Sequence, residues 1–179
     1  MAKGAGGNSK QGVVVGILMG SDTDLPVMSE AARILEKFSI PYEMEVVSAH
    51  RTPARAHEYA TAAISRGLKV LIVGAGAAAH LAGVMAANTT LPVIGVPLAT
   101  SALNGMDALL ATVQMPGGIP VATMAVDKAG ATNAGIFAAQ ILGLSDPEIA
   151  RRLIEHKEEL VRGVAEKNAR LQQQVASKK

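Results

Sequence analysis

The amino-acid sequence predicts an α/β protein in which a central parallel sheet carries helices on both faces and a long helix follows at the C-terminus. Short apolar segments rich in β-branched residues alternate with segments whose apolar residues recur at helical spacing. Hydrophobic residues make up 49% of the 179 residues and charged residues only 18%. This composition supports a large core, excludes a disordered chain, and fits one domain.

Five short apolar segments have the composition of buried strands. Glycine, proline or polar turn residues bound each of them, as is typical where a strand ends. The predicted strands are residues 13–19, 43–47, 70–73, 92–96 and 121–125.

Between these strands the apolar spacing changes to that of a helix with one buried face. Apolar residues share such a face in the segment after the first strand: Met28, Ala31, Ala32, Leu35 and Phe38. This helix begins near Pro26, which suits a first turn. The further helices are predicted at residues 53–66, 77–88, 106–114 and 131–142.

The last segment predicts a long helix from about Ser145 to Leu171. Ser145 and Glu148 have the spacing of a capping box, and Pro147 suits the first turn. The apolar residues form a narrow stripe in steps of four and seven: Ile149, Leu153, Leu160, Val164 and Leu171. Such a stripe on a charged rod predicts packing on a neighbouring subunit, with packing on its own domain as the alternative.

Three regions follow from these patterns. Residues 1–12 are glycine-rich and basic and lack the apolar core of a secretory signal, so they are interpreted as a disordered tail. Residues 13–145 form the α/β domain, and residues 146–179 form the C-terminal helix with a frayed basic end.

Composition argues against several classes of function. The chain has no cysteine, which excludes disulfides, zinc–thiolate clusters and thiol nucleophiles, and its four histidines lack metal-ligand spacing. Aromatic residues are 2% and the net charge is +2, so a nucleic-acid partner is not expected. Residues 70–106 carry no Asp, Glu, Lys or Arg, but glycines and prolines interrupt the run, so a membrane span is not expected either.

Charge is unevenly distributed along the chain. Residues 70–145 carry three formal charges, whereas residues 146–179 carry fourteen. A monomer needs a mostly polar surface, so this middle region predicts burial against other copies of the chain. The alternative is a well-covered sheet with helices of small residues.

Polar residues gather where the predicted strands end. MGSDTD (residues 19–24) follows the first strand, SAHRTP (48–53) the second and GAGAAAH (74–80) the third. In the flavodoxin-like strand order 2-1-3-4-5 these strands are neighbours, and ligands bind beyond their carboxyl ends. The three loops are therefore predicted to form one pocket.

The residues of these loops indicate a ribose-phosphate site. Backbone N–H groups at Ser21 precede a helix and attract an anion, and Arg51 offers a planar charged fork suited to phosphate. Asp24 is an acceptor suited to sugar hydroxyls. Beside them, His50 can move protons near neutral pH, and His80 is a second imidazole at the rim.

Each feature also has a purely structural interpretation. Ser21 and Asp24 could be helix caps, and His80 could be a satisfied core histidine. The G-x-G at residues 74–76 lacks the full dinucleotide motif and follows the third strand. The functional interpretation depends on the convergence of phosphate, ribose and acid–base groups at three separate strand ends.

These motifs, together with QMPGGIPV and KAGATNAGIFAAQIL, resemble the class I 5-(carboxyamino)imidazole ribonucleotide mutase family of de novo purine biosynthesis. The resemblance covers about residues 13–155. It implies a cytoplasmic isomerase with a single flavodoxin-like three-layer domain, assembled as a homo-octamer. It also implies a small ribonucleotide substrate and no metal, ATP, biotin or other cofactor.

The resemblance also implies residue roles. Ser21 and Arg51 hold the phosphate, Asp24 the ribose, and His50 is the catalytic histidine, with His80 beside it. The remaining substrate-binding residues that it implies are Ser48, Gly74, Gly76, Ala78 and Leu81. The family reaction moves a carboxylate from the exocyclic nitrogen to the neighbouring ring carbon through carbon dioxide. Ala77–Ala79, Leu81 and the MPGG loop (115–118) look suited to enclose that gas.

The chain departs from the family pattern at several positions. Ala77 and Asp127 stand where glycine is usual, Ala82 where proline is usual, Asn88 where lysine is common, and Thr23 where serine is usual. None of these changes removes a titrating group of the predicted site.

Two other functions remain open. Related enzymes carboxylate aminoimidazole ribonucleotide directly with carbon dioxide and typically carry lysine after the motif's histidine, where this chain has Arg51. A non-catalytic sugar-phosphate-binding module would keep Ser21, Asp24 and Arg51 but would have no use for His50.

Overall fold

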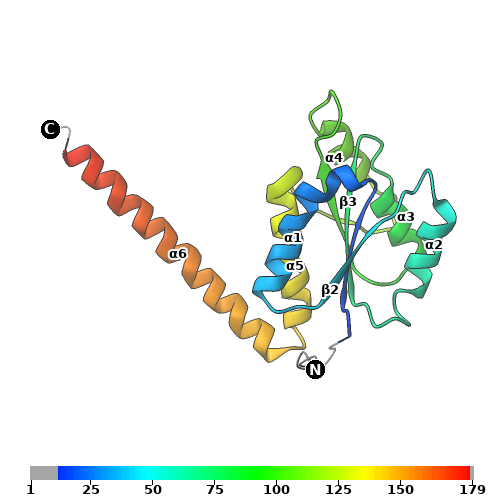
Figure 1. Cartoon of the computed structure of the whole chain (residues 1–179), viewed down its shortest axis with the longest axis horizontal. Coiled ribbons are helices and arrows are strands. Elements are labelled where there is room, and N and C mark those ends of the chain that lie inside the picture. Colours follow the sequence, from blue (N-terminus) through cyan, green and yellow to red (C-terminus); the bar gives the residue numbers. More distant parts are fainter. Residues whose placement is uncertain (1–11, 178–179) are drawn as a thin grey trace, which may run out of the picture. The chain divides into compact units, whose positions relative to one another are not determined.

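The computed structural model describes residues 12–177 and contains one five-stranded parallel sheet in the order β2-β1-β3-β4-β5 (Figure 1). The strands are β1 (Val15–Met19), β2 (Tyr42–Val46), β3 (Val70–Gly76), β4 (Val93–Leu98) and β5 (Ala122–Thr123). The predicted strand order is confirmed. Apart from Gly12, the predicted disordered tail lies outside the described residues.

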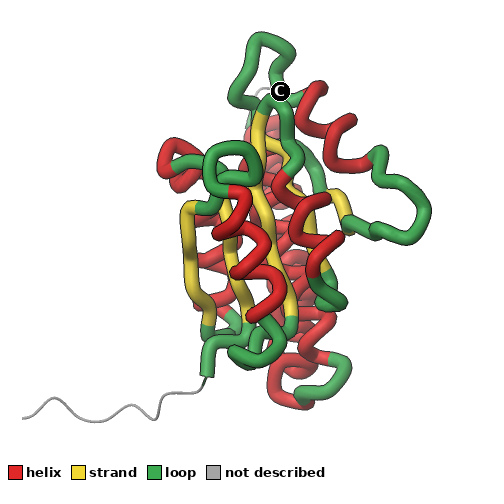
Figure 2. The backbone as a smooth tube through the Cα atoms, turned by 90° about the vertical axis from the view of Figure 1, so that its right-hand side faces the viewer, coloured by secondary structure: helices red, strands yellow, loops and turns green. Residues whose placement is uncertain are grey.

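Helices cover both faces of the sheet, which confirms the predicted three layers (Figures 1 and 2). The helices are α1 (Leu25–Lys37), α2 (Pro53–Ala62), α3 (Leu81–Asn88), α4 (Met106–Val113), α5 (Asp127–Gly143) and α6 (Pro147–Ala176). A short 3₁₀ turn, η1 (Asp22–Asp24), precedes α1. Helices α1 and α5 lie together, since a Cβ at Gly135 would be 2.8 Å from the Ile34 Cβ. Side chains of α2, α3 and α4 share a core on the other face.

The central strands are buried along their length because helices cover both of their faces. Every residue of β1 and β4 is buried, as is all of β3 except its last residue. Strand β2 lies at one edge of the sheet. Glutamate alternates with less polar residues along it, at Glu43 and Glu45. Those two carboxylates are paired with Arg66 and Arg55, which keeps charge on this exposed edge.

Several element boundaries differ from the prediction. Strand β3 continues to Gly76 and α3 begins at Leu81, since Ala77 has a left-handed backbone (φ +49°) that a helix cannot contain. Helix α5 begins at Asp127, four residues early, and α2 ends at Ala62. Strand β5 has two residues instead of the five predicted.

The capping box predicted at Ser145 is wrong. Asp146 is the N-cap of α6, and its Oδ1 accepts the N–H groups of Glu148 (3.0 Å) and Ile149 (3.3 Å). The Ser145 hydroxyl donates instead to the Leu142 carbonyl. The helix also runs five residues past the predicted end, because the polar residues beyond its apolar stripe are good helix formers.

The chain divides into two compact units within α5, at Ala138. The pocket described below belongs entirely to the first unit. Among the described residues, no helix is both long and apolar enough to cross a membrane.

Candidate active site

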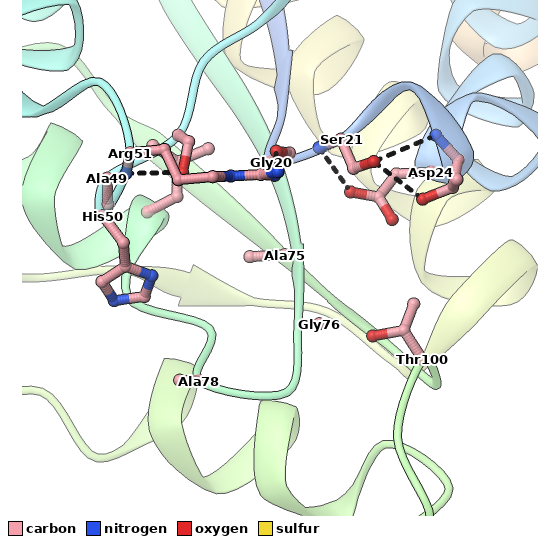
Figure 3. Close-up of a pocket in the computed structure, with 13 residues that line it drawn as sticks. Gly20, Ser21, Asp24, Ala49, His50, Arg51, Ala75, Gly76, Ala78 and Thr100 are labelled. Atoms are coloured by element: carbon pink, nitrogen blue, oxygen red, sulfur yellow. Dashed lines mark hydrogen bonds between the residues drawn. The ribbon is translucent and has the colours of Figure 1, made fainter.

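The carboxyl ends of the sheet strands surround a pocket of about 470 Å³ (Figure 3). The three predicted loops meet there, and the end of β4 joins them. The residues that line the pocket are Gly20, Ser21, Thr23, Asp24, Ser48, Ala49, His50, Arg51, Ala75, Gly76, Ala78, Leu81 and Thr100.

The first loop is held by a reciprocal pair of hydrogen bonds. The Ser21 Oγ accepts the Thr23 N–H (3.3 Å), and the Asp24 Oδ2 accepts the Ser21 N–H (3.1 Å). Asp24 is 6% exposed, and burial raises the pKa of its carboxyl, while the N–H of Ser21 and the positive Arg51 oppose that rise. Ser21 and Asp24 are therefore both caps of η1 and lining residues of the pocket.

The second loop is closed by its own serine and threonine. Ser48 Oγ accepts the Arg51 N–H (3.1 Å), and Thr52 Oγ1 accepts the Ser48 N–H (3.0 Å). The Thr52 hydroxyl also donates to the Ser48 carbonyl (3.0 Å). Because these bonds fix the turn, His50 and Arg51 project from a defined backbone.

Two side-chain contacts connect the second loop to its neighbours. The Arg51 Nη2 donates to the Gly20 carbonyl (3.0 Å), which ties it to the first loop. The His50 Nε2 lies 2.8 Å from the His80 Nδ1, with the rings at 75° to each other, which ties it to the third loop. The two imidazoles share one hydrogen bond, so the nitrogen of one ring that donates requires an unprotonated nitrogen on the other ring.

Two predicted residues do not line the pocket. Gly74 lies inside β3, and a Cβ there would collide with the Met28 side chain of α1, so this glycine faces the core. His80 is exposed and is not a lining residue, but its ring is hydrogen-bonded to the lining residue His50. The MPGG loop, residues 115–118, is likewise not part of the lining.

Thr100 is a lining residue that the sequence reasoning missed. It follows β4, whose carboxyl end lies beside that of β3. A Cβ at Gly76 would collide with the Thr100 hydroxyl, so this threonine rests directly on the β3 backbone. The rule that selected the first three loops would have found it, because a polar Thr-Ser pair follows the fourth strand.

No group of three or more His, Cys, Asp or Glu residues that could hold a metal ion occurs among residues 12–177. The pocket lining offers an arginine, a buried carboxylate, hydroxyls, backbone N–H groups and the His50 imidazole. These groups can hold an anion and a polyol and can move a proton.

An open parallel sheet with such a pocket at its carboxyl edge defines an α/β protein of the doubly wound class, in which ligands bind at this edge. The AIR carboxylase family model matches residues 14–162, and the chain belongs to that family.

Named relatives agree with this assignment. The chain is 61% identical to the N5-carboxyaminoimidazole ribonucleotide mutase of Thermotoga maritima over 89% of its own length and 92% of that protein. It is 58% identical to the Pyrococcus horikoshii protein of the same name, over 89% of each. Among solved structures it resembles Treponema denticola PurE, with a TM-score of 0.79, 28% identity, and coverage of 88% of this chain and 98% of that chain.

Proposed function

We propose that the protein is an N5-carboxyaminoimidazole ribonucleotide mutase, the isomerase that produces 4-carboxy-5-aminoimidazole ribonucleotide in de novo purine biosynthesis. One observation carries the proposal: the turn at Ser21, Arg51 and His50, whose Nε2 lies 2.8 Å from the His80 Nδ1, meet in a single pocket. Relatives that are 58–61% identical over nearly nine-tenths of the chain carry this activity in their names.

The anchoring half of the pocket fits a ribose phosphate. The Arg51 side chain holds the Gly20 carbonyl with one N–H, and a guanidinium carries further donors for phosphate oxygens. The Ser21 hydroxyl and nearby backbone N–H groups complete the anion site. One oxygen of Asp24 accepts the Ser21 N–H, and its carboxylate is the acceptor for the ribose hydroxyls.

The reaction moves the carboxylate between two atoms of the substrate. The bond from the exocyclic nitrogen to the carboxyl carbon breaks, releasing carbon dioxide, and that nitrogen gains a proton. A carbon–carbon bond then forms at the ring carbon, which loses its proton. His50 can serve both proton transfers, because one imidazole donates and then accepts. With its Nε2 on His80, the His50 Nδ1 is the nitrogen that exchanges the proton.

The released carbon dioxide must stay beside the ring. Apolar groups from the second and third loops line this part of the pocket, namely Ala49, Ala75, Ala78 and Leu81. They offer carbon dioxide no proton and no hydration, which favours its recapture at carbon.

Turnover without bicarbonate separates the candidate functions. We expect the purified protein to convert the carboxyamino substrate in bicarbonate-free buffer. A direct carboxylase would instead act on aminoimidazole ribonucleotide and bicarbonate but not on the carboxyamino compound. A sugar-phosphate-binding module would bind either ribonucleotide and convert neither.

The assembly that we propose is a cytoplasmic homo-octamer. Apolar side chains are exposed on α4 and just before it: Leu103, in the preceding turn, is 64% exposed and Met106 56%, followed on the helix by Leu110 and Val113. This face lies in the nearly uncharged region, and contact between subunits would remove it from water. Sedimentation should give a mass eight times that of the 18.4 kDa chain. An active monomer would contradict the assembly.

We further propose that α6 packs on neighbouring subunits. Its apolar stripe includes Leu160, Val164 and Leu171, each more than half exposed. Replacing these three residues with serine should lower the assembled mass, whereas serine at Glu166 and Lys167 on the same helix should leave the mass unchanged. Full assembly of the triple variant would contradict this role.

A further inference from the structure

The residue that opens α5 has an unusual backbone for its type. Asp127 has φ +60°, the left-handed region that favours glycine. A residue other than glycine keeps this backbone conformation only where the surrounding structure holds it there. The contacts of the Asp127 carboxylate show what imposes it here.

That carboxylate connects two distant segments of the first unit. Its Oδ1 accepts the Ala99 N–H at 2.8 Å, although the two residues are 28 positions apart. Ala99 is the first residue after β4, and an ionised acceptor makes this bond stronger than a neutral one. Asp127 therefore fixes the backbone at the point where β4 leaves the sheet.

The segment before α5 holds the other end of the same loop. Gly105 has φ +86°, and a Cβ there would lie 2.6 Å from the Val126 side chain and 3.3 Å from the Ala99 Cα. Residues 99–105 are thus held by Val126 and Asp127 together. The position of any pocket side chain on this loop depends on these two residues.

Thr100 is that side chain. It lines the pocket, and its hydroxyl contacts Gly76 at the end of β3. In Figure 3, Thr100 and His50 lie on opposite sides of Gly76. A ligand whose reacting end lies beside His50 therefore has the Thr100 hydroxyl on its other flank, where it can donate or accept a hydrogen bond.

We propose that Thr100 is a further substrate contact, on the base end of the ribonucleotide, and that Asp127 is the positioning residue that sets where its hydroxyl lies. This inference rests on the proposed function for the identity of the ligand. The carboxylate acts through the Ala99 N–H and touches no reacting atom.

The test measures equilibrium binding of aminoimidazole ribonucleotide by calorimetry, together with kcat. Thr100→Ala and Asp127→Gly should each raise Kd about three- to tenfold, as expected for one lost hydrogen bond, with kcat within about twofold of the wild type. Asp127→Asn keeps an oxygen acceptor and tolerates the left-handed backbone, so its Kd should stay within about twofold. Glycine relieves the backbone, so the Tm of Asp127→Gly should not fall with its affinity.

A double-mutant cycle distinguishes positioning from a separate effect. If Asp127 acts through Thr100, the Asp127→Gly/Thr100→Ala protein should bind no more weakly than the weaker single variant. The proposal would be overturned if the two substitutions multiplied their effects on Kd in the double variant, or if Thr100→Ala left Kd unchanged. If Asp127→Gly misfolds, Thr100→Ala alone still tests whether Thr100 contacts the substrate. Wild-type binding without turnover would count against the mutase function and leave the binding comparison valid, whereas no wild-type binding would overturn both.

Discussion

The first two loops of the pocket and the third are held in different ways. Ser21 with Asp24, and Ser48 with Thr52, close the first two loops through hydrogen bonds between close neighbours in sequence. The third loop, residues 77–80, presents three alanines before His80, begins with a left-handed residue, and is tied to the second loop through the imidazole pair. The bonds that close each of the first two loops are local, whereas the loops are joined to one another by contacts between distant segments, Arg51 to Gly20 and His50 to His80.

Substitutions in the His50–His80 pair, which joins the second and third loops, should have the largest effect on kcat. His50→Asn should lower kcat by at least about 10²–10⁴-fold, because asparagine keeps a polar tip but cannot carry the proton, while ligand binding stays largely intact. His80→Asn should lower kcat less, because His80 acts through His50.

Paired kcat and Kd measurements check both histidine variants. His57→Asn is the matched control, since this exposed histidine bonds Asn88 outside the pocket. If His80→Asn loses turnover while His50→Asn keeps it, the two roles are reversed.

Loss of Arg51 tests the anchoring half. Arg51→Ala should weaken ribonucleotide binding by about 1.5–3 kcal/mol, the range for a hydrogen bond to a charged group. Arg51→Lys should recover part of this, because a point charge cannot replace a planar fork. Calorimetric titration gives the affinity. Arg33→Ala, which removes an exposed arginine paired with Glu30 on α1, should bind like the wild type. Unchanged affinity in Arg51→Ala would place the phosphate elsewhere.

Replacing the left-handed alanine of the third loop with glycine should raise the free energy of unfolding. Ala77 has φ +49°, so Ala77→Gly should raise the free energy of unfolding by about 0.5–1 kcal/mol, the relief of left-handed strain less the entropy that glycine loses on folding. Thermal unfolding measures this. Ala78→Gly, at the next residue, relieves no such strain and should lower Tm. A lower Tm for Ala77→Gly would show that Ala77 is not strained.

The smallest expected effect is a pH dependence at Asp24. Burial raises the pKa of its carboxyl above 3.8, so the folded protein holds this proton more tightly than the unfolded chain does. Ionisation of Asp24 therefore costs stability, fully above the folded pKa and not at all below the unfolded pKa.

The Asp24→Asn variant reports this cost. It should be at least as stable as the wild type at neutral pH, and the difference in Tm should shrink as the pH falls toward about 4. Glu166→Gln, which removes an exposed carboxylate on α6 far from Asp24 in sequence, is the control. A difference in Tm that grows on acidification would show the opposite sign for the shift at Asp24.

The parallel sheet and its layers followed from the sequence because period and composition are local properties, whereas the strand order was taken from the flavodoxin-like fold. Each buried strand is a short apolar run, and each helix shows its own spacing, so the alternation alone predicts a parallel sheet. The same locality explains why Ser21, Ser48 and Arg51 were found: each follows directly after a strand. The predicted ends of elements differed from the structure at Asp146 and Ala77, because a single hydrogen bond or a single φ angle decides where an element begins or ends.

The sequence by itself determined the sheet, the three loops and the chemical types they carry. Tertiary structure alone decided that His80 is hydrogen-bonded to His50, that Gly74 faces Met28 in the core, and that Asp127 holds the backbone beside Thr100. The physical reason is the separation in sequence over which each interaction acts. Periodicity and capping act within a few residues, whereas these contacts join residues 28 to 46 positions apart, and their geometry exists only after the strands have aligned in register.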